Sequence, residues 1–329
     1  MDKFLNKILI VDGSYTLHRA LHTPGLQELC STSGVKSGGI YGALRILQSE
    51  MKKFPEYFPI VCFDRGLSKR RTDLYPAYKA NRNRGITDSL IAIGKTPEDV
   101  YYEEYRNQRS DLIGVLKSVG IPSLMIYGYE GDDLMYLLST YSEESVILSD
   151  DKDMLQLVSP TCRVRRSLKN ELITWEESGE YYHNPRFIIR KSIVGDESDN
   201  IPKVAQGVGE KTADALSECI AKYSFENMKE GLRQESQNLK PRLKESAEKV
   251  INNWDQFEVN YNLMNLQLVE VPLEFDDLIK KLILGTLGKT NLFNAYNLLG
   301  KYELNTIFPD QLIALTAMSS TQVLKKGYV

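Results

Sequence analysis

The chain has 329 residues, of which 42% are hydrophobic, and its 41 Lys and Arg residues against 44 Asp and Glu residues give a formal net charge of −3. This apolar content excludes an intrinsically disordered chain, and no stretch approaches the roughly 20 uninterrupted apolar residues of a membrane helix. The first residues lack the apolar core of a secretion signal, and the widely spaced cysteines argue against a disulfide framework or a Cys-based zinc site. We therefore expect a cytoplasmic protein that does not contact membranes.

Short apolar runs alternate with segments of helical period in the first half of the chain. The runs cover residues 7–12, 59–64, 122–127 and 145–151, and helical-period segments include 42–54 and 109–119. Continuous apolar runs suit strands that are covered on both faces. Their alternation with helices predicts an α/β fold with a mostly parallel central sheet flanked by helices. Ligands gather at the carboxyl ends of such strands, which is where Asp12, Asp64 and Asp151 lie.

The segment from residue 65 to about 105 lacks clear periodicity and is rich in Arg, Lys, Asn, Gly and Thr. We interpret it as a mobile basic element. Within it, cations are mixed with tyrosines, and Arg and Lys bind phosphates while Tyr stacks on unpaired bases. A solvated basic loop is the alternative. The candidate nucleic-acid contacts in this segment are Arg70, Arg71, Tyr78, Lys79 and Arg82.

Carboxylates gather in four groups, each at an expected strand end or helix start. The candidate metal ligands are Asp12, Asp64, Glu130, Asp132, Asp133, Asp151, Asp153, Asp196 and Asp199. Carboxylates that are brought together repel one another, so such a cluster needs cations. Oxygen ligands without His or Cys favour Mg²⁺ or Mn²⁺ over zinc. Two such ions are the usual apparatus for phosphodiester hydrolysis, although each small acidic pair alone is common on protein surfaces.

The second half of the chain has a helical pattern with few strand signals. We expect an α/β domain over residues 1–184 and a helical subdomain over 185–329, in which the segment 282–308 packs back on the body and a loose tail follows residue 319. The sequence Gly207-Val208-Gly209-Glu210-Lys211-Thr212 lacks the spacing of an ATP-binding phosphate loop. A turn between two helices explains it better, because its glycines expose backbone N–H groups to a phosphate. Gly207, Gly209, Lys211 and Thr212 are therefore candidate contacts to a duplex backbone, with ordinary helix packing as the alternative.

Several motifs occur together in one order. They are Val11-Asp12-Gly13-Ser14, Phe63-Asp64, the segment 73–82, Gly128-Tyr129-Glu130-Gly131-Asp132-Asp133, the segment 151–157, the segment 195–202 and the segment 207–212. Because it contains these motifs in this order, the chain resembles the 5′-nucleases over roughly residues 7–220. That family includes flap endonucleases, phage 5′→3′ exonucleases or RNases H, and the N-terminal nuclease domain of bacterial DNA polymerase I.

The resemblance implies a PIN-like body with a helical arch at about residues 65–105 and a helix–hairpin–helix motif. It assigns the nine carboxylates to two Mg²⁺ ions, which Mn²⁺ could replace, and gives Lys79, Arg82 and Asp132 roles at the scissile phosphate. Tyr78 would lie near the threaded strand, and the 207–212 turn would hold the duplex, with K⁺ as a candidate ion there. The implied enzyme is a monomeric, free-standing nuclease of a bacterial cell or phage-infected host.

The implied activity is structure-specific 5′-nuclease cleavage of DNA with a 5′ flap or 5′ end, together with primer removal from an RNA–DNA hybrid, in DNA replication and repair. A single-strand binding protein, a sliding clamp or a polymerase is a candidate partner. The alternative is a non-catalytic DNA-structure binding protein on the same scaffold. An aspartyl phosphohydrolase is disfavoured, because Asp12-Gly13-Ser14 lacks the second Asp two positions on. Asp150 and residues 225–262 have no assignment.

Overall fold

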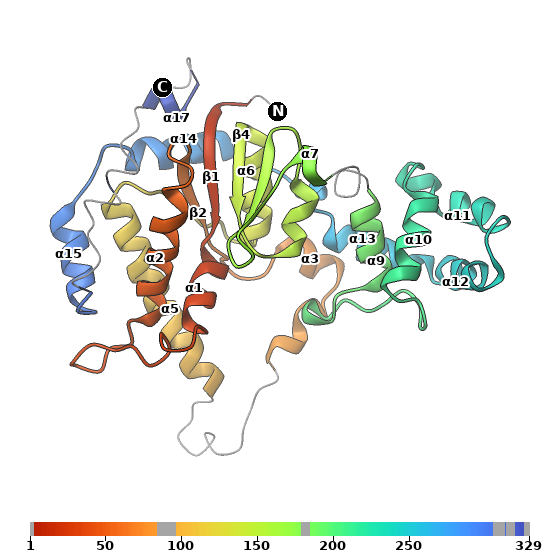
Figure 1. Cartoon of the computed structure of the whole chain (residues 1–329), viewed down its shortest axis with the longest axis horizontal. Helices are drawn as coiled ribbons and strands as arrows, with labels where there is room; N and C mark the ends of the chain where they lie inside the picture. Colours follow the sequence, from red (N-terminus) through yellow and green to blue (C-terminus); the bar gives the residue numbers. More distant parts are fainter. Residues whose placement is uncertain (1–2, 84–96, 179–184, 305–312, 314–319, 326–329) are drawn as a thin grey trace.

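The computed structural model describes residues 3–83, 97–178, 185–304, 313 and 320–325. Its centre is a six-stranded sheet with the strand order β3-β2-β1-β4-β5-β6 (Figure 1). The strands are β1 (Leu5–Asp12), β2 (Phe58–Cys62), β3 (Ser123–Leu124), β4 (Ser142–Leu148), β5 (Cys162–Arg166) and β6 (Glu171–Ile173). Neighbouring strands are parallel except β5 and β6, which are antiparallel. The predicted mostly parallel α/β fold is confirmed.

The central strand β1 is apolar on both faces because helices cover both sides of the sheet. Ile8 and Ile10 point into one core, while Leu9 and Val11 point into the other, and all four are fully buried. This follows from the period of two along a strand. The first core includes residues of α6 (Gly131–Tyr141), α14 (Phe275–Thr286) and α17 (Ser320–Val323), and the second includes residues of α1 (Gly13–Leu21), α2 (Gly38–Met51), α5 (Pro97–Ser118) and α15 (Leu292–Gly300).

The structure differs from the sequence-based expectations at the sheet edges and in the basic segment. The run at 122–127 forms a strand over two residues only, and β5 and the edge strand β6 carry too many polar residues to have been recognised. Helix α5 begins at Pro97, inside the segment without clear periodicity. Proline at the first helical position is a normal start signal, but the polar sequence that follows hid the helix. The rest of the basic segment contains α3 (Lys69–Leu74) and the 3₁₀ helix η1 (Ala80–Asn83), and the arch tip at 84–96 lies outside the described residues.

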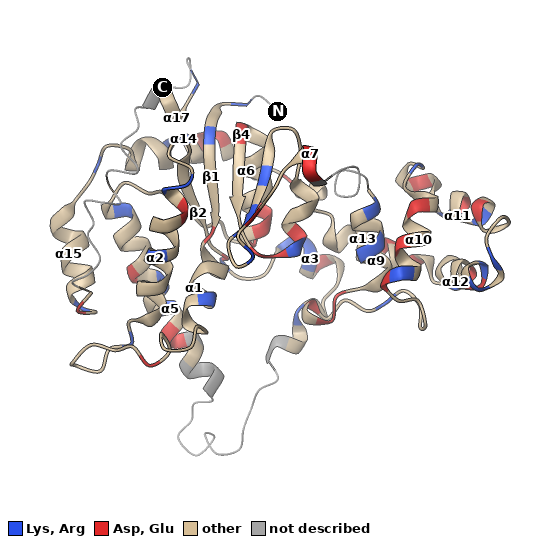
Figure 2. Ribbon diagram, viewed as in Figure 1, with Lys and Arg blue, Asp and Glu red and all other residues tan. Residues whose placement is uncertain are grey.

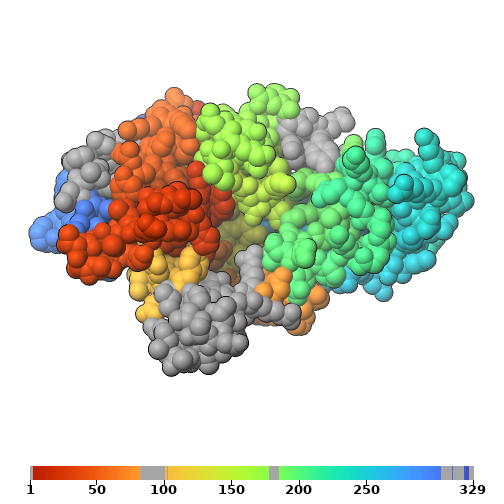
Figure 3. Space-filling model, turned by 60° about the horizontal axis from the view of Figure 1, so that its bottom comes forward, coloured from red at the N-terminus to blue at the C-terminus, as the bar shows by residue number. Residues whose placement is uncertain are grey.

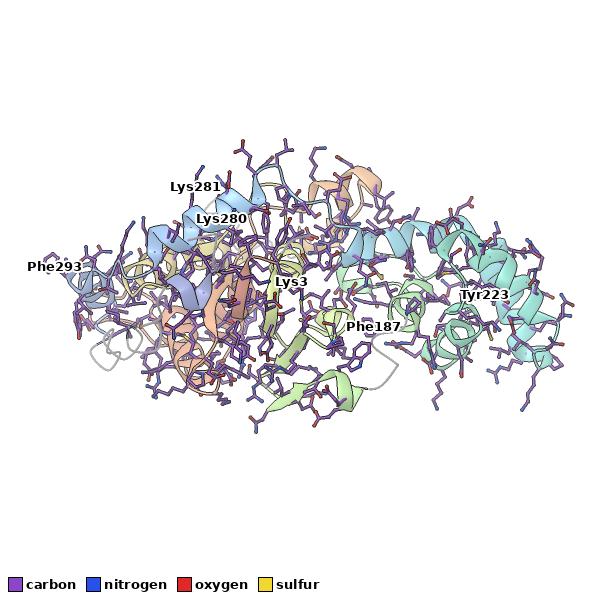
Figure 4. All side chains as sticks on the ribbon, turned by 90° about the horizontal axis from the view of Figure 1, so that it is seen from above. Lys3, Phe187, Tyr223, Lys280, Lys281 and Phe293 are labelled. Atoms are coloured by element: carbon purple, nitrogen blue, oxygen red, sulfur yellow. The ribbon has the colours of Figure 1, made fainter. Side chains whose placement is uncertain are left out.

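Five helices form a region with its own core at one end of the molecule (Figure 1). They are α9 (Arg186–Val194), α10 (Glu210–Ile220), α11 (Met228–Ser236), α12 (Pro241–Asn252) and α13 (Trp254–Met264). Residues 225–262, which the sequence left unassigned, supply much of this core. Phe187 and Tyr223 line a cavity of about 300 Å³ there, beside Phe225 and Tyr261 (Figure 4). The cavity contains none of the candidate metal ligands.

The chain after α13 returns to the α/β body. Phe275, Ile279 and Ile283 of α14 join the core under the sheet, and Leu299 of α15 joins the opposite core. Figure 4 shows Lys280 and Lys281 on α14, which runs along the body. The structure therefore separates the helical region over about 185–264 from the C-terminal helices, and the division at residue 184 stays a prediction. Within the described part of the chain, no helix has both the length and the apolar character needed to cross a membrane.

Candidate active site

Asp12 lies at the end of β1, where it caps helix α1. Its carboxylate accepts hydrogen bonds from the Tyr15 backbone N–H (2.8 Å) and from the Ser149 hydroxyl (2.9 Å). Burial and the nearby charge of Asp64 raise the pKa of Asp12 to about 8. The fold therefore holds this carboxyl where its ionised form needs a positive partner.

Asp64 follows β2, the neighbour of β1 in the sheet, and so lies beside Asp12. Its Oδ1 accepts a hydrogen bond from the Gly131 backbone N–H at 2.6 Å, which ties it to the start of α6. A Cβ added at Gly131 would lie 3.2 Å from that oxygen, so the glycine permits a close approach of backbone and carboxylate. Arg109 of α5 donates to the backbone carbonyl of Asp64 at 3.0 Å. The base of the arch is thereby joined to a carboxylate of the site.

The second group of carboxylates starts helix α6 and surrounds Arg71. Glu130 is the N-cap residue, and Asp133 accepts from the Glu130 backbone N–H at 3.0 Å, which completes a capping box. The Arg71 guanidinium reaches Glu130 (2.5 Å), Asp132 (2.8 Å) and Asp133 (3.1 Å). Burial by itself would raise the pKa of Asp132, but the charges of Arg71 and Lys79 lower it. Burial and the charge of Asp132 raise the pKa of Asp133 to about 6.

The third and fourth groups meet at Lys191 of helix α9. Its ammonium group pairs with Asp153 and lies 3.1 Å from Asp196. Burial alone would lower the pKa of Lys191, but Asp153 and then Asp196 raise it. Asp151 caps the 3₁₀ helix η2 (Lys152–Leu157) by accepting from the Asp153 N–H at 2.8 Å. Asp196 caps η3 (Glu197–Asp199) in the same way.

All four groups contribute to one cavity of about 270 Å³. Eight of the nine predicted carboxylates line it, namely Asp12, Asp64, Glu130, Asp132, Asp151, Asp153, Asp196 and Asp199. Figure 3 shows a hollow between the red N-terminal residues and the green residues near α9 and α10. Acidic and basic segments adjoin at the same end of the sheet in Figure 2. Three cations, from Arg71, Lys79 and Lys191, contact these acids directly.

Of these cations Lys79 lines the cavity, whereas Arg71 and Lys191 pair with its carboxylates from an adjoining pocket. Within the ranges that the structure describes, no three His, Cys, Asp or Glu side chains form a preformed metal-binding group. The sequence predicts nine acids in one site that needs cations; eight of them line this cavity, and Arg71, Lys79 and Lys191 supply positive charge beside them. The donor set itself, which consists of oxygens at strand and helix ends, matches the preference of Mg²⁺ and Mn²⁺.

Three predicted site residues lie differently from the expectation. Asp133 does not line the cavity, because it is buried against Arg71 and holds the start of α6. Arg71 is buried with a side-chain exposure of 3%, so it is not available to DNA. Tyr78 is also 3% exposed, and its hydroxyl donates to Glu130 at 2.9 Å instead of facing a threaded strand. Arg71 and Tyr78 are drawn inward because unpaired carboxylates in the interior need hydrogen-bond donors.

The other basic residues of this segment differ in position. Lys79 lines the cavity, and its ammonium lies 2.5 Å from Glu130. Its backbone has a positive φ of 56°, and its N–H donates to the Asp199 carbonyl at 2.9 Å. Arg70 is half-buried and donates to the backbone carbonyl of Asn262. Arg82 lies in η1, and its side chain is outside the described residues.

The predicted helix–turn–helix joins α9 and α10, which pack against each other. Gly207 has a φ of +80°, a conformation that glycine adopts freely. Gly209 is the N-cap residue of α10, and Lys211 is exposed in the first turn with Thr212 beside it. The turn thus presents backbone N–H groups and a lysine at the surface.

Sequence reasoning missed two residues that line the cavity, and a third, Lys191, that pairs with acids of the cavity. His18 and Tyr15 project from α1 into it, and the His18 ring stacks on Tyr105 of α5 with a centroid distance of 4.2 Å. His18 is not among the predicted site residues, because the sequence shows no nucleophilic Ser or Cys that it would serve. Lys191 had no signal beyond its position five residues before Asp196. Burial and Asp150 raise the pKa of Tyr15 to about 12.

A parallel sheet with carboxylates at its strand ends, a basic segment over them and a helix–turn–helix beside them defines a class of nucleic-acid-cleaving enzyme. The family model described as "5'-3' exonuclease, N-terminal resolvase-like domain" matches residues 7–183. A 5′-3′ exonuclease of Buchnera aphidicola subsp. Acyrthosiphon pisum (strain APS) is 31% identical over 299 residues, covering 88% of this chain and 96% of that protein. The chain belongs to the 5′-3′ exonuclease family and is a nuclease.

Solved structures of the T5 5′-exonuclease share the fold. One, with bound divalent zinc ions, has a TM-score of 0.59 at 21% identity and covers 91% of this chain and 100% of its own. Another is the bacteriophage T5 flap endonuclease as a pseudo-enzyme–product complex with DNA and metal ions, with a TM-score of 0.57 at 21% identity, covering 91% and 99%. The PIN-like body expected from the sequence is confirmed.

Proposed function

We propose that this nuclease is metal-dependent and structure-specific, and that it cuts DNA at a 5′ flap or 5′ end and removes RNA from RNA–DNA hybrids. The observation that carries the proposal is the cavity at the strand ends with eight carboxylates and three paired cations. The T5 relatives are described with divalent metal ions and with DNA. The proposed setting is DNA replication and repair in the cytoplasm of a bacterial or phage-infected cell.

The proposed cofactor is a pair of Mg²⁺ ions, for which Mn²⁺ can substitute. Asp12, Asp64, Glu130, Asp132 and Asp151 would hold one side of the site, and Asp153, Asp196 and Asp199 the other. Asp133 is left out of this set because Arg71 and the helix start occupy it. When bound, such ions neutralise phosphate charge and make water a stronger nucleophile. The raised pKa of Asp12 supports this assignment, because a buried carboxyl of that kind gains from a cation.

The protein's own groups would orient the substrate. Lys79 lies in the cavity and is the proposed partner of the scissile phosphate, with Arg82 further along the arch and Asp132 among the metal ligands. Lys79 is only 12% exposed and is paired with Glu130. This ion pair must therefore open before Lys79 can act on the substrate: a phosphate takes the place of Glu130 beside Lys79, or a metal ion takes the place of Lys79 beside Glu130. Arg70 is a proposed supporting contact at the edge of the arch.

The duplex would bind at the turn between α9 and α10. The backbone N–H groups near Gly207 and Gly209, together with Lys211 and Thr212, contact phosphates without reading bases. K⁺ is a proposed ligand of the same turn. The enzyme is proposed to act as a monomer, with a single-strand binding protein, a sliding clamp or a polymerase as candidate partners.

Cleavage assays test this function directly. The wild-type protein should cut a 5′-flap substrate with Mg²⁺ or Mn²⁺ and leave it intact in EDTA, and product mapping on a nicked duplex and an RNA–DNA hybrid would define the range of substrates. Asp151→Asn or Asp132→Asn should reduce the rate by about a hundredfold or more while duplex binding stays intact. Full activity of the Asp132→Asn variant at millimolar Mg²⁺ would contradict the proposal.

A further inference from the structure

Asp150 directly precedes Asp151 but does not line the cavity of carboxylates. Its side chain is 6% exposed, and both of its oxygens contact the turn between β5 and β6. Oδ1 accepts from the Leu168 backbone N–H at 3.0 Å, and Oδ2 accepts from the Ser167 hydroxyl at 3.1 Å. The position that the sequence left unassigned is thus a hydrogen-bonding centre beside the site.

The same centre holds Arg19 of helix α1. The Arg19 guanidinium donates to the Ser167 hydroxyl at 2.5 Å and lies 3.8 Å from Asp150 Oδ2. Arg19 directly follows His18 and lies one helical turn after Tyr15, and both of those residues line the cavity. Its side chain is 24% exposed, so this charged group is partly open to solvent on the helix that also carries Tyr15 and His18.

The turn has a second contribution to its shape besides Asp150. Asn170, with a φ of 55°, closes the turn in the left-handed region, and its side-chain oxygen accepts from Arg165 at 2.6 Å. Asparagine tolerates that region better than most residues. Beyond the turn, Asp150 interacts with two residues of α1, namely Tyr15 and Arg19, and of these Arg19 carries the opposite charge.

We propose that Asp150 is a positioning residue that holds Arg19 at the rim of the cavity, where Arg19 binds a backbone phosphate of the incoming strand. The inference rests on the proposed function. A guanidinium has five N–H donors, so contacts to Ser167 and Asp150 leave donors for a phosphate. Because the side chain is already fixed in place, less rotamer freedom is lost on binding.

The test compares Asp150→Ala, Arg19→Ala and the double variant for binding of a 5′-flap DNA by fluorescence anisotropy in EDTA, and for KM and kcat with Mg²⁺. Each single variant should weaken binding and raise KM by about tenfold, with kcat at saturating DNA changed by less than about twofold. The double variant should bind no more weakly than either single variant, because both changes remove one interaction.

Glu171→Gln is the matched control, because it removes a carboxylate from the same hairpin that faces Arg166 instead of Arg19. Asp150→Asn keeps an acceptor for the Leu168 N–H and loses the charge, so it should reproduce the binding defect without a change in Tm. Multiplied losses in the double variant, a fall in kcat at unchanged KM, or a shifted Mg²⁺ requirement would overturn the inference. If the wild type binds flap DNA but cuts no substrate, the proposed function fails while the binding comparison still decides the role of Asp150.

Discussion

Arg71 holds Asp132 through two parallel hydrogen bonds, Nη1 to Oδ1 at 3.1 Å and Nη2 to Oδ2 at 2.8 Å. Two-pronged pairs of this kind are among the strong hydrogen bonds in proteins. Because the same guanidinium also contacts Glu130 and Asp133, Arg71 acts as a fixed counter-charge beneath the cavity. The basic segment of the arch is thus anchored in the acidic site by a residue that never reaches the surface.

Removal of this counter-charge should destabilise the fold. Arg71→Met removes the cation that Glu130, Asp132 and Asp133 share and leaves only Lys79, which pairs with Glu130. We therefore expect a loss of about 3–5 kcal/mol in the free energy of unfolding. Urea denaturation followed by circular dichroism measures it. Lys69→Met is the control, since Lys69 is 72% exposed in its pair with Asp73, and it should cost less than about 1 kcal/mol. A loss at Arg71 no larger than that of the control would contradict this account.

Lys79 should matter more for the cleavage step than for binding. Lys79→Ala removes a cation of the arch segment. Among the three cations Arg71, Lys79 and Lys191, it is the one that lines the carboxylate cavity. We expect the single-turnover cleavage rate to fall by about a hundredfold while the Kd for flap DNA rises less than about threefold. Arg70→Ala serves for comparison, because Arg70 does not line the cavity. Equal effects of Lys79→Ala on rate and Kd would refute a role at the scissile phosphate.

Duplex binding should weaken as salt rises, because it depends on phosphate contacts. Lys211→Ala should weaken binding of all duplex sequences alike and lower the salt slope by about one. Titrations of a blunt duplex from low to moderate salt measure both effects. Lys229→Ala, on α11 away from the turn, is the control. An unchanged slope for Lys211→Ala would remove this turn from the interface.

The stability of the metal-free protein should depend on pH through Asp12. Its pKa in the folded state is raised from 3.8 to about 8, so the folded chain holds a proton that the unfolded chain releases. This contribution is fully present below about pH 4 and is lost as the pH rises toward 8. Divalent metal should therefore raise Tm more at pH 8 than at pH 6. Asp12→Asn should reduce the difference to the part that comes from Asp153, whose pKa burial raises to about 6, and a wild-type metal effect independent of pH would count against it.

The sequence predicted the fold correctly wherever continuous runs of apolar residues form strands that are buried on both faces. Strands β1, β2 and β4 are buried on both faces, and their carboxyl ends bring Asp12, Asp64 and Asp151 together as the parallel arrangement required. Strand β5, next to the edge of the sheet, escaped notice because Arg163 and Arg165 interrupt the apolar pattern and pair with residues distant in sequence, Glu144 and Glu50.

The site was predictable in its acids but not in its cations. Carboxylates at strand ends are visible in the sequence, whereas the direction of a long side chain depends on tertiary packing. Arg71 and Tyr78 belong to a segment rich in surface-type residues, yet the neighbouring Glu130 draws both inward. Lys191 pairs with Asp153, which lies 38 positions earlier, so no local pattern could show the contact.

The two ends of the described chain are neighbours at the sheet. Leu5 of β1 pairs with Leu324, and the Lys325 N–H donates to the Phe4 carbonyl at 2.9 Å. A short linker could therefore join the ends, and the polypeptide could be opened elsewhere, since adjacent termini favour circular permutation. New ends could then be placed at the distal helices α11 and α12, far from β1. Such a rearranged chain would carry a fusion partner or surface tether without disturbing the central strand.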